Sequence, residues 1–208
     1  MTTSAHLRHL RHGTHVLGCF MTNTKIAEQN SLLISLIAGD PVRIRLLAAV
    51  QRLQLPDCWV GAGFVRPLIW DHAHDRLPSA LAGDLDVVWF DSSRAMSAVD
   101  IEIQERLTLA ESSFRWSVKN QARMHERNAD SPYASTEGAI KHWPETATAV
   151  AVRQVAGKVE ILAPFGLDDL FSLIVRPTPD FIAEKLPIYQ NRVREKRWLE
   201  RWPRLVVQ

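Results

Sequence analysis

A short segment in the first half of the chain alternates apolar and acidic residues. Leu85, Val87 and Trp89 occupy every second position, and Asp84 and Asp86 stand between them. Successive side chains of a β-strand point to opposite faces of the sheet, so the pattern predicts a strand with one buried face. The two carboxylates share the other face, where their oxygen atoms can bind a divalent cation together.

A glycine turn precedes this strand by about twenty residues. Residues 58–60 read as a short apolar strand, Gly61-Ala62-Gly63 as the turn, and residues 64–74 as the helix that follows. Exposed N–H groups at such a turn, before a helix, bind phosphate. Turn and acidic strand together therefore indicate a site for a phosphate and its metal ion.

The rest of the chain alternates between helical and extended patterns, which predicts an α+β protein with a mixed β-sheet flanked by helices. A hairpin is expected at Ala156-Gly157, because Gly157 supplies the turn between two arms rich in β-branched residues. The expected helices span 25–37, 41–54, 98–110 and 135–142, and the further strands span 84–91, 114–119, 148–155 and 158–162.

The domain organisation is simple. With 208 residues, 46% hydrophobic and 23% charged, the chain has the composition of a globular protein. Residues 1–22 are expected to form a disordered extension and residues 23–208 a single domain, with Met21 as an alternative start of the chain.

The location expected from the sequence is the cytoplasm. The longest apolar run of the chain is too short to span a bilayer, and the N-terminal residues lack the apolar region of a secretory signal. The two cysteines, Cys19 and Cys58, are too few for a disulfide framework, which favours a reducing compartment.

Positive charge is concentrated near the C-terminus. Residues 181–208 hold 7 basic and 3 acidic side chains. Arginines mixed with aromatic residues can bind phosphates and stack on unpaired bases. The favoured interpretation is a terminal amphipathic helix, in which Trp198 and Trp202 lie one turn apart and pack on the core.

Two motifs resemble a known superfamily. The segments GAGFVRPLIWD (61–71) and DLDVVWFD (84–91) are similar to the head of DNA polymerase β-type nucleotidyltransferases, in particular to the GGxVRD and DxD motifs of CCA-adding enzymes and bacterial poly(A) polymerases. From about residue 40 to 205 the chain is identified as a member of the DUF925 or NTP_transf_6 nucleotidyltransferase-like family. The most specific segments are LPDCWVGAGFVRPLIWD, WSVKNQARMH, HWPETATAVAVR and LAPFGLDDLFSLIVRPTP.

The resemblance implies a fold and an activity. It implies a nucleotidyltransferase-type core that transfers a nucleoside monophosphate from an NTP to an RNA or small-molecule acceptor, with Mg²⁺ or Mn²⁺ as cofactor. Asp84 and Asp86 match the catalytic, metal-binding pair. The turn residues Gly61, Ala62 and Gly63 match the phosphate-binding turn, and Arg66 matches the arginine of the VR dipeptide.

The chain departs from the active pattern at two places. Pro67 stands where the VRD motif has aspartate, and no acidic residue occurs between positions 112 and 125, where active members carry a third carboxylate on the next strand. The expected strand there ends in Lys119 and Asn120, which we expect to contact the phosphates or a base edge.

Two functions therefore stay open. Asp91, Glu102 and Glu105 are the candidates for a substitute third carboxylate if the protein is an active transferase. If none of them serves, the alternative is a weakly active or inactive nucleotide- or RNA-binding protein that retains the fold.

Overall fold

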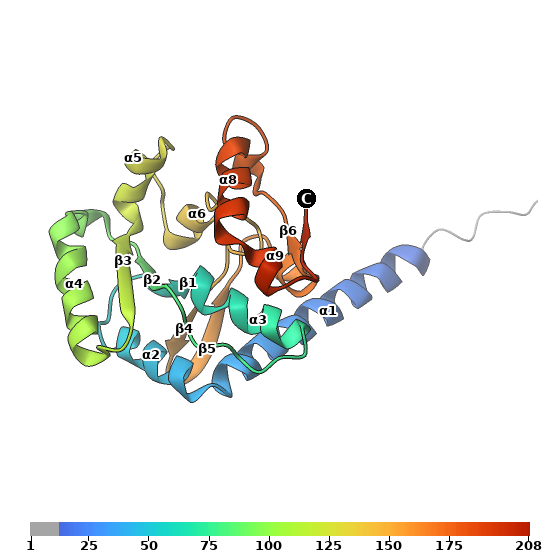
Figure 1. Cartoon of the computed structure of the whole chain (residues 1–208), viewed down its shortest axis with the longest axis horizontal. Coiled ribbons are helices and arrows are strands. Elements are labelled where there is room, and N and C mark those ends of the chain that lie inside the picture. The colour runs from blue at the N-terminus through green and yellow to red at the C-terminus, as the bar shows by residue number, and fades with distance from the viewer. Residues whose placement is uncertain (1–12) are drawn as a thin grey trace, which may run out of the picture.

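The computed structural model describes the backbone of residues 13–208 and the side chains from residue 23 onward. Its main sheet has five strands in the order β3-β2-β1-β4-β5 (Figure 1). β2 and β3 are parallel, whereas the other neighbouring strands are antiparallel. The five strands are β1 (Trp59–Gly61), β2 (Asp84–Trp89), β3 (Arg115–Asn120), β4 (Ala151–Val155) and β5 (Lys158–Leu162).

The helices alternate with these strands as the sequence predicts. The α-helices are α1 (Gly13–Ala38), α2 (Pro41–Gln51), α3 (Arg66–Ala73), α4 (Ser97–Ala110), α5 (Met124–Asn128), α6 (Thr136–Ile140), α7 (Asp168–Phe171), α8 (Leu186–Lys196) and α9 (Trp198–Arg201). Short 3-10 helices are η1 (Ala62–Phe64), η2 (Ser92–Arg94), η3 (Gln121–Arg123) and η4 (Pro179–Phe181). The α+β class with a mixed sheet flanked by helices is confirmed.

The N-terminal region differs from the expectation in part. Residues 13–22, which the sequence places in an extension, form the first part of α1, although no helix was expected before residue 25. Residues 1–12 lie outside the described residues, so an extension there stays a prediction. Among the helices of the described part, none is long and apolar enough to cross a membrane.

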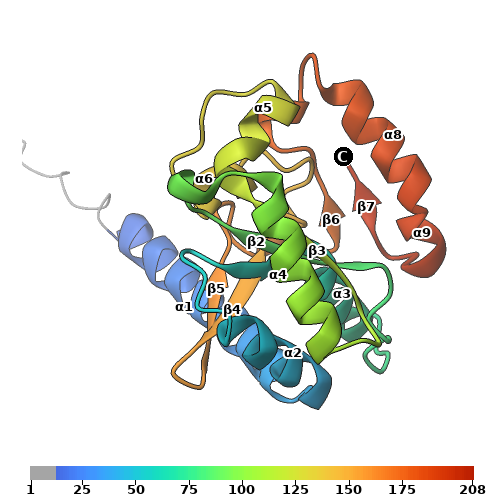
Figure 2. The ribbon, with the colours of Figure 1, turned by 90° about the vertical axis from the view of Figure 1, so that its left-hand side faces the viewer.

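The two faces of the sheet bury different partners. Leu85, Val87 and Trp89 of β2 point into the main core, which α1, α2, α3 and α4 share. Val88 points the other way and packs in a smaller cluster with Ile140 of α6. Figure 2 shows α4 and α2 on the near side of the sheet, with α5 and α6 above it. The alternation of β2 is therefore as predicted, and it leaves the face of Asp86 away from the main core.

Local signals explain where several elements begin and turn. The side chain of Asp40 accepts hydrogen bonds from the N–H groups of Val42 and Arg43 at the start of α2, each at 3.0 Å. Ala156 and Gly157 both adopt positive φ, at 47° and 79°, which makes the tight turn between β4 and β5. The turn at Ala156-Gly157 was predicted from the sequence.

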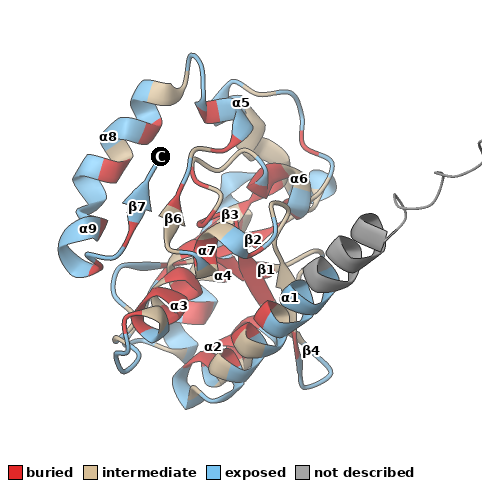
Figure 3. Cartoon of the chain, turned by 90° about the vertical axis from the view of Figure 1, so that its right-hand side faces the viewer, coloured by how far each residue is buried: buried red, intermediate tan, exposed pale blue. Residues whose placement is uncertain are grey.

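The C-terminal segment folds back on the core. The rings of Trp198 and Trp202 contact Trp70 edge to face, with centroids 5.6 and 5.1 Å away. The indole N–H of Trp202 donates to Asp71 at 2.8 Å. Beyond α9, β7 (Val206–Val207) pairs in parallel with β6 (Ile174–Val175). Figure 3 shows buried residues on α3 and at intervals along α8 and α9, so the predicted packing of the terminal segment is confirmed.

We predict that Trp198→Ala destabilises the protein by about 3–5 kcal/mol, because it leaves a cavity against Trp70 where a 4% exposed indole had been. The matched control is Leu199→Ala, since Leu199 is 43% exposed on the same helix and should change the free energy of unfolding by under about 0.5 kcal/mol. Urea unfolding curves measure both. Equal stabilities for the two variants would show that the terminal segment is not anchored through Trp198.

Candidate functional site

The pairing of β2 with β3 determines which side chains stand beside Asp86. In this parallel register Asp86 pairs with Ser117, and Val88 pairs with Lys119. Paired residues of neighbouring strands point to the same face of a sheet. Asp86, Ser117 and Lys119 therefore share one face, opposite to the main core.

A pocket of about 540 Å³ opens over this face. We call it the Asp86 pocket. Its walls come from the sheet, from α5, from the segment before β4 and from η4 and α8. The lining residues are Ala62, Asp86, Val88, Ser117, Lys119, Gln121, Met124, Arg127, Asn128, His142, Trp143, Pro144, Thr148, Phe181, Lys185, Ile188 and Arg192. Its volume suits a single small-molecule ligand.

Of the two predicted metal-binding aspartates, Asp86 lines the pocket and Asp84 lies outside its lining. Asp84 lies on the same face by strand alternation, but its side chain is 60% exposed and its carboxylate lies 3.1 Å from Nε of Arg115. An exposed ion pair of this kind contributes under about 1 kcal/mol to stability, so the Asp84 carboxylate can exchange Arg115 for another partner at little cost.

Opposing influences act on the Asp86 carboxyl. Burial raises its pKa, and the charge of Asp84 raises it further. A hydrogen bond from Ser117 and the charges of Arg192 and Lys196 act in the opposite direction, and the net pKa is raised. A carboxylate destabilised by burial and by a like charge gains from a bound cation, and carboxylate oxygens are ligands that Mg²⁺ accepts. The carboxylates of Asp84 and Asp86 therefore suit one divalent ion.

The glycine turn lies at the edge of the pocket. Ala62 lines the pocket and has a positive φ of 44°. Gly61 faces the ring of Trp143, and a Cβ added there would lie 2.6 Å from it, whereas one added at Gly63 would meet nothing within 4 Å. Packing against Trp143 therefore requires Gly61 to lack a side chain, and the open side of the turn is at Gly63.

Arg66 does not line the pocket. It is buried, with its guanidinium 4.5 Å from the ring centroid of Trp198 and 5.1 Å from that of Trp70. Its Nε and one Nη have no hydrogen-bond partner. Burial lowers the pKa of Arg66 to about 10, although the charge of Glu145 acts against this. The structure thus places Arg66 beneath α9, as a cation stacked between two indoles.

Lys119 and Asn120 take different places. Lys119 lines the pocket, as expected for a residue that contacts a phosphate. The Asn120 side chain is buried and donates to the carbonyls of Asp91 and Arg94, at 2.8 and 3.0 Å. Asn120 does not line the pocket, because its side-chain amide forms hydrogen bonds with backbone groups of the turn that follows β2.

A third carboxylate is absent from the part of the pocket that the structure describes. The β3 residue beside Asp86 is Ser117. Asp91 caps η2, and its pKa is lowered to about 2, chiefly by a hydrogen bond from Ser93. Glu102 and Glu105 are exposed on α4 and do not line the pocket. None of the three proposed substitutes is placed beside Asp86.

The sequence analysis missed the contribution of α8. Arg192 lines the pocket, and its Nε donates to Oε1 of Glu145 at 2.8 Å. Glu145 is fully buried, and its other oxygen accepts a hydrogen bond from Thr148 at 2.6 Å. The excess of basic residues after position 181 was a signal for this role, because it marks the segment that supplies Arg192.

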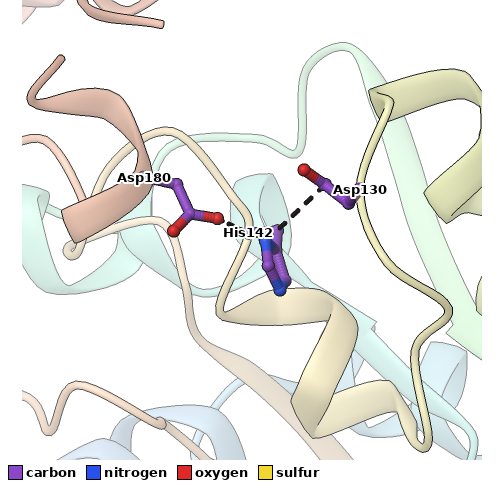
Figure 4. A group of neighbouring side chains, drawn as sticks. All are labelled: Asp130, His142 and Asp180. Atoms are coloured by element: carbon purple, nitrogen blue, oxygen red, sulfur yellow. Dashed lines mark ion pairs between the residues drawn. The ribbon is translucent and has the colours of Figure 1, made fainter. Parts of the chain in front are cut away.

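A second group of ionisable residues lies at the mouth of the pocket. Nδ1 of His142 forms an ion pair with Asp180 and lies 3.6 Å from Asp130 (Figure 4). The three side chains offer ligand atoms within 4.8 Å of one another, so they can hold a metal ion. Nζ of Lys185 also lies 2.6 Å from Asp130 and would compete with that ion. In this arrangement the group links η4 and the start of α8 to the segment after α5.

Comparison with known proteins agrees with this geometry. The sequence pattern of the NTP_transf_6 family, described as nucleotidyltransferase, matches residues 48–207. A solved NMR structure, described as revealing a CCA-adding enzyme head domain, is 30% identical and superposes with a TM-score of 0.76. That match covers 85% of this chain and 94% of the other. No curated protein matches the chain.

Two larger solved structures show the fold alone. A CCA-adding enzyme in complex with CTP is 17% identical with a TM-score of 0.52, over 86% of this chain and 42% of that one. The Thermotoga maritima CCA-adding enzyme in complex with tRNA is 16% identical with a TM-score of 0.53, over 84% and 42%. This chain spans less than half the length of these two proteins.

We predict that Gly61→Ala destabilises the protein by about 1–3 kcal/mol, because the new methyl group overlaps the Trp143 ring. Gly63→Ala is the matched control and should leave the free energy of unfolding almost unchanged, since its methyl group enters open space. Denaturant unfolding measures both variants. A stable Gly61→Ala protein would contradict the packing role of this glycine.

We also predict that Asp86→Asn raises the melting temperature at pH 7 in a buffer without divalent ions. The folded protein holds the pKa of Asp86 above its ordinary value of 3.8, so ionisation of this group costs stability, and the cost grows as pH rises through the raised pKa. The advantage of the variant should disappear toward pH 3.5, where the carboxyl is protonated in both states. Asp75→Asn is the control, because the Asp75 side chain is 90% exposed.

Proposed function

The chain belongs to the NTP_transf_6 nucleotidyltransferase family, and from this we propose that it binds a nucleoside triphosphate in the Asp86 pocket and transfers the nucleoside monophosphate to an acceptor. The observation that carries the proposal is the placement of one half-buried carboxylate, Asp86, in a pocket whose other described lining side chains are basic or neutral. Such a lining favours a polyanion accompanied by a metal ion.

In this proposal each group has a defined task. Asp86, with Asp84 released from its exposed pair with Arg115, would hold one Mg²⁺ or Mn²⁺. The ion would neutralise charge on the triphosphate and activate the acceptor hydroxyl. The open side of the turn at Gly63 leaves room for a phosphate to approach the backbone. Lys119 would neutralise phosphate charge from β3.

The acceptor is proposed to be an RNA or a small molecule. Two observations support an RNA end. Solved structures with the same fold include complexes described with CTP and with tRNA. Arg194, Lys196 and Arg197 are exposed at the end of α8, outside the pocket lining. Exposed cations at such a position can bind an RNA backbone.

A second candidate function is nucleotide binding with weak or absent transfer. It is favoured by the β3 register, which places Ser117 and Lys119 beside Asp86 and Val88. The positive charge of Lys119 would repel a second metal ion. A further carboxylate that could hold this second ion beside the acceptor hydroxyl is not found among the described residues of the pocket. The two candidates share the nucleotide site and differ only in turnover.

A labelling experiment separates them. The full chain is incubated with each α-labelled NTP, with Mg²⁺ or Mn²⁺, and with RNA or metabolite pools, and label transfer is measured beside metal-dependent nucleotide binding. The transferase proposal requires metal-dependent binding together with label transfer. The second candidate, which the β3 register favours, requires binding with weak or absent transfer. Asp86→Asn should abolish the metal-dependent part of binding, and Asp75→Asn should leave it unchanged.

One result would contradict the proposal, and another would decide between the two candidates. Metal-dependent binding that survives Asp86→Asn would show that the ion lies elsewhere. Robust transfer that disappears in Asp84→Asn would establish an active enzyme and overturn the second candidate.

A further inference from the structure

Basic side chains outnumber acidic side chains in the described lining of the Asp86 pocket. Four of its lining side chains are lysine or arginine, namely Lys119, Arg127, Lys185 and Arg192, and within the described part of the chain Asp86 is the only lining carboxylate. The four basic residues come from β3, from α5 and from the start and middle of α8. Charge is therefore supplied from three sides of the cavity.

These cations are not equally available to a ligand. Lys185 is already neutralised, since its Nζ lies 2.6 Å from Asp130 and donates to the carbonyl of Asn128 at 3.3 Å. Lys119 and Arg127 have no ion pair or side-chain hydrogen bond within the described residues. Their charges face the pocket without a compensating carboxylate.

Arg192 is held at its Nε edge and by the ring of Trp198, whose centroid lies 5.8 Å from the guanidinium carbon. Its Nε binds Glu145, which is fully buried and is itself fixed by Thr148. A guanidinium has five N–H donors, so this contact leaves the four donors of the two Nη groups for a ligand. The side chain is 33% exposed. An arginine oriented in this way loses little entropy when it binds an anion.

A phosphate chain also meets a barrier at the glycine turn. The Trp143 ring occupies the space over Gly61, so only Ala62 and Gly63 remain open for a close approach. The unpaired donors lie instead on Lys119, Arg127 and Arg192. Most of the anion-binding capacity of the pocket is thus on the α5 and α8 side.

We propose that Lys119, Arg127 and Arg192 form a polyphosphate subsite, in which Arg192 of α8 binds phosphate oxygens through its two Nη groups. The ligand class is a linear di- or triphosphate. This inference rests on the proposed function for the identity of its physiological ligand, an NTP. It adds that the preference for a triphosphate over a monophosphate of the same nucleoside comes from these three basic side chains.

The test uses inorganic tripolyphosphate as probe, with the full chain in EDTA and no nucleotide. Isothermal titration calorimetry should show binding that weakens as salt is raised. Arg192→Gln should weaken it about tenfold or more, since charge-assisted hydrogen bonds to phosphate are lost. The control Arg106→Gln removes an equal charge from an exposed position of α4, outside the pocket lining, and should bind like the parent.

A second variant covers the risk that Arg192→Gln perturbs Glu145. Arg127 is exposed and forms no ion pair or side-chain hydrogen bond with the described residues, so Arg127→Gln should keep the melting temperature and still weaken tripolyphosphate binding severalfold. With nucleotides as probes, both variants should lose affinity for an NTP and retain that for the matching nucleoside monophosphate.

The outcome is independent of transfer, because the assay contains no metal ion, nucleoside or acceptor. A parent protein that does not bind tripolyphosphate would overturn the subsite, and so would variants that bind it as tightly as the parent. Tripolyphosphate binding that depends on Arg192, with no label transfer from any NTP, would support the subsite and reject only the transferase reading of the pocket.

Discussion

The register between β2 and β3 is the constraint on which the rest of the site depends. Asp86 faces Ser117, and Val88 faces Lys119, because the two strands run parallel with this pairing. The register is held at its end by Asn120, whose N–H donates to the buried carboxylate of Asp100 at 3.0 Å. A slip by one residue would turn Lys119 toward the main core. The electrostatics of the pocket therefore follow from backbone pairing.

The C-terminal segment completes the pocket by a different kind of interaction. The Trp198 ring lies over the guanidinium of Arg66 and contacts Trp70 edge to face, and this packing fixes the segment that follows α8. Arg192, one and a half turns earlier, is thereby positioned to reach Glu145. A buried carboxylate needs a partner, so Glu145 and Arg192 depend on each other. Loss of the aromatic contacts would release a wall of the pocket as well as stability.

The sequence alone predicted the features that depend on local pattern. Strand alternation placed Asp86 and Lys119 on the open face, and the Ala156-Gly157 turn followed from residue preferences. Contacts between distant segments were beyond it. Arg192 and Glu145 are 47 residues apart in the sequence, and nothing local to either residue indicates the other.

Two candidate residues were placed elsewhere for related reasons. The motif match brought Arg66 into the predicted nucleotide site, whereas the structure stacks it between Trp70 and Trp198, a contact that only the returning C-terminal segment creates. Asn120 follows Lys119 directly, but the next position of a strand points to the opposite face. Its amide therefore serves the turn after β2. Arg66 and Asn120 are close to pocket residues in the sequence, but neither lines the pocket.

The charges of the pocket also constrain the form in which a ligand can bind. A bare divalent cation beside Asp86 would meet the charges of Lys119 and Arg127. A bare polyphosphate would use those basic side chains and leave the Asp86 carboxylate, which burial and Asp84 already destabilise, without a cation. A complex of a metal ion with a polyphosphate satisfies both, because its cation lies against Asp86 and its oxygens against the basic side chains. The two halves of the lining thus favour one ligand that carries both charges together.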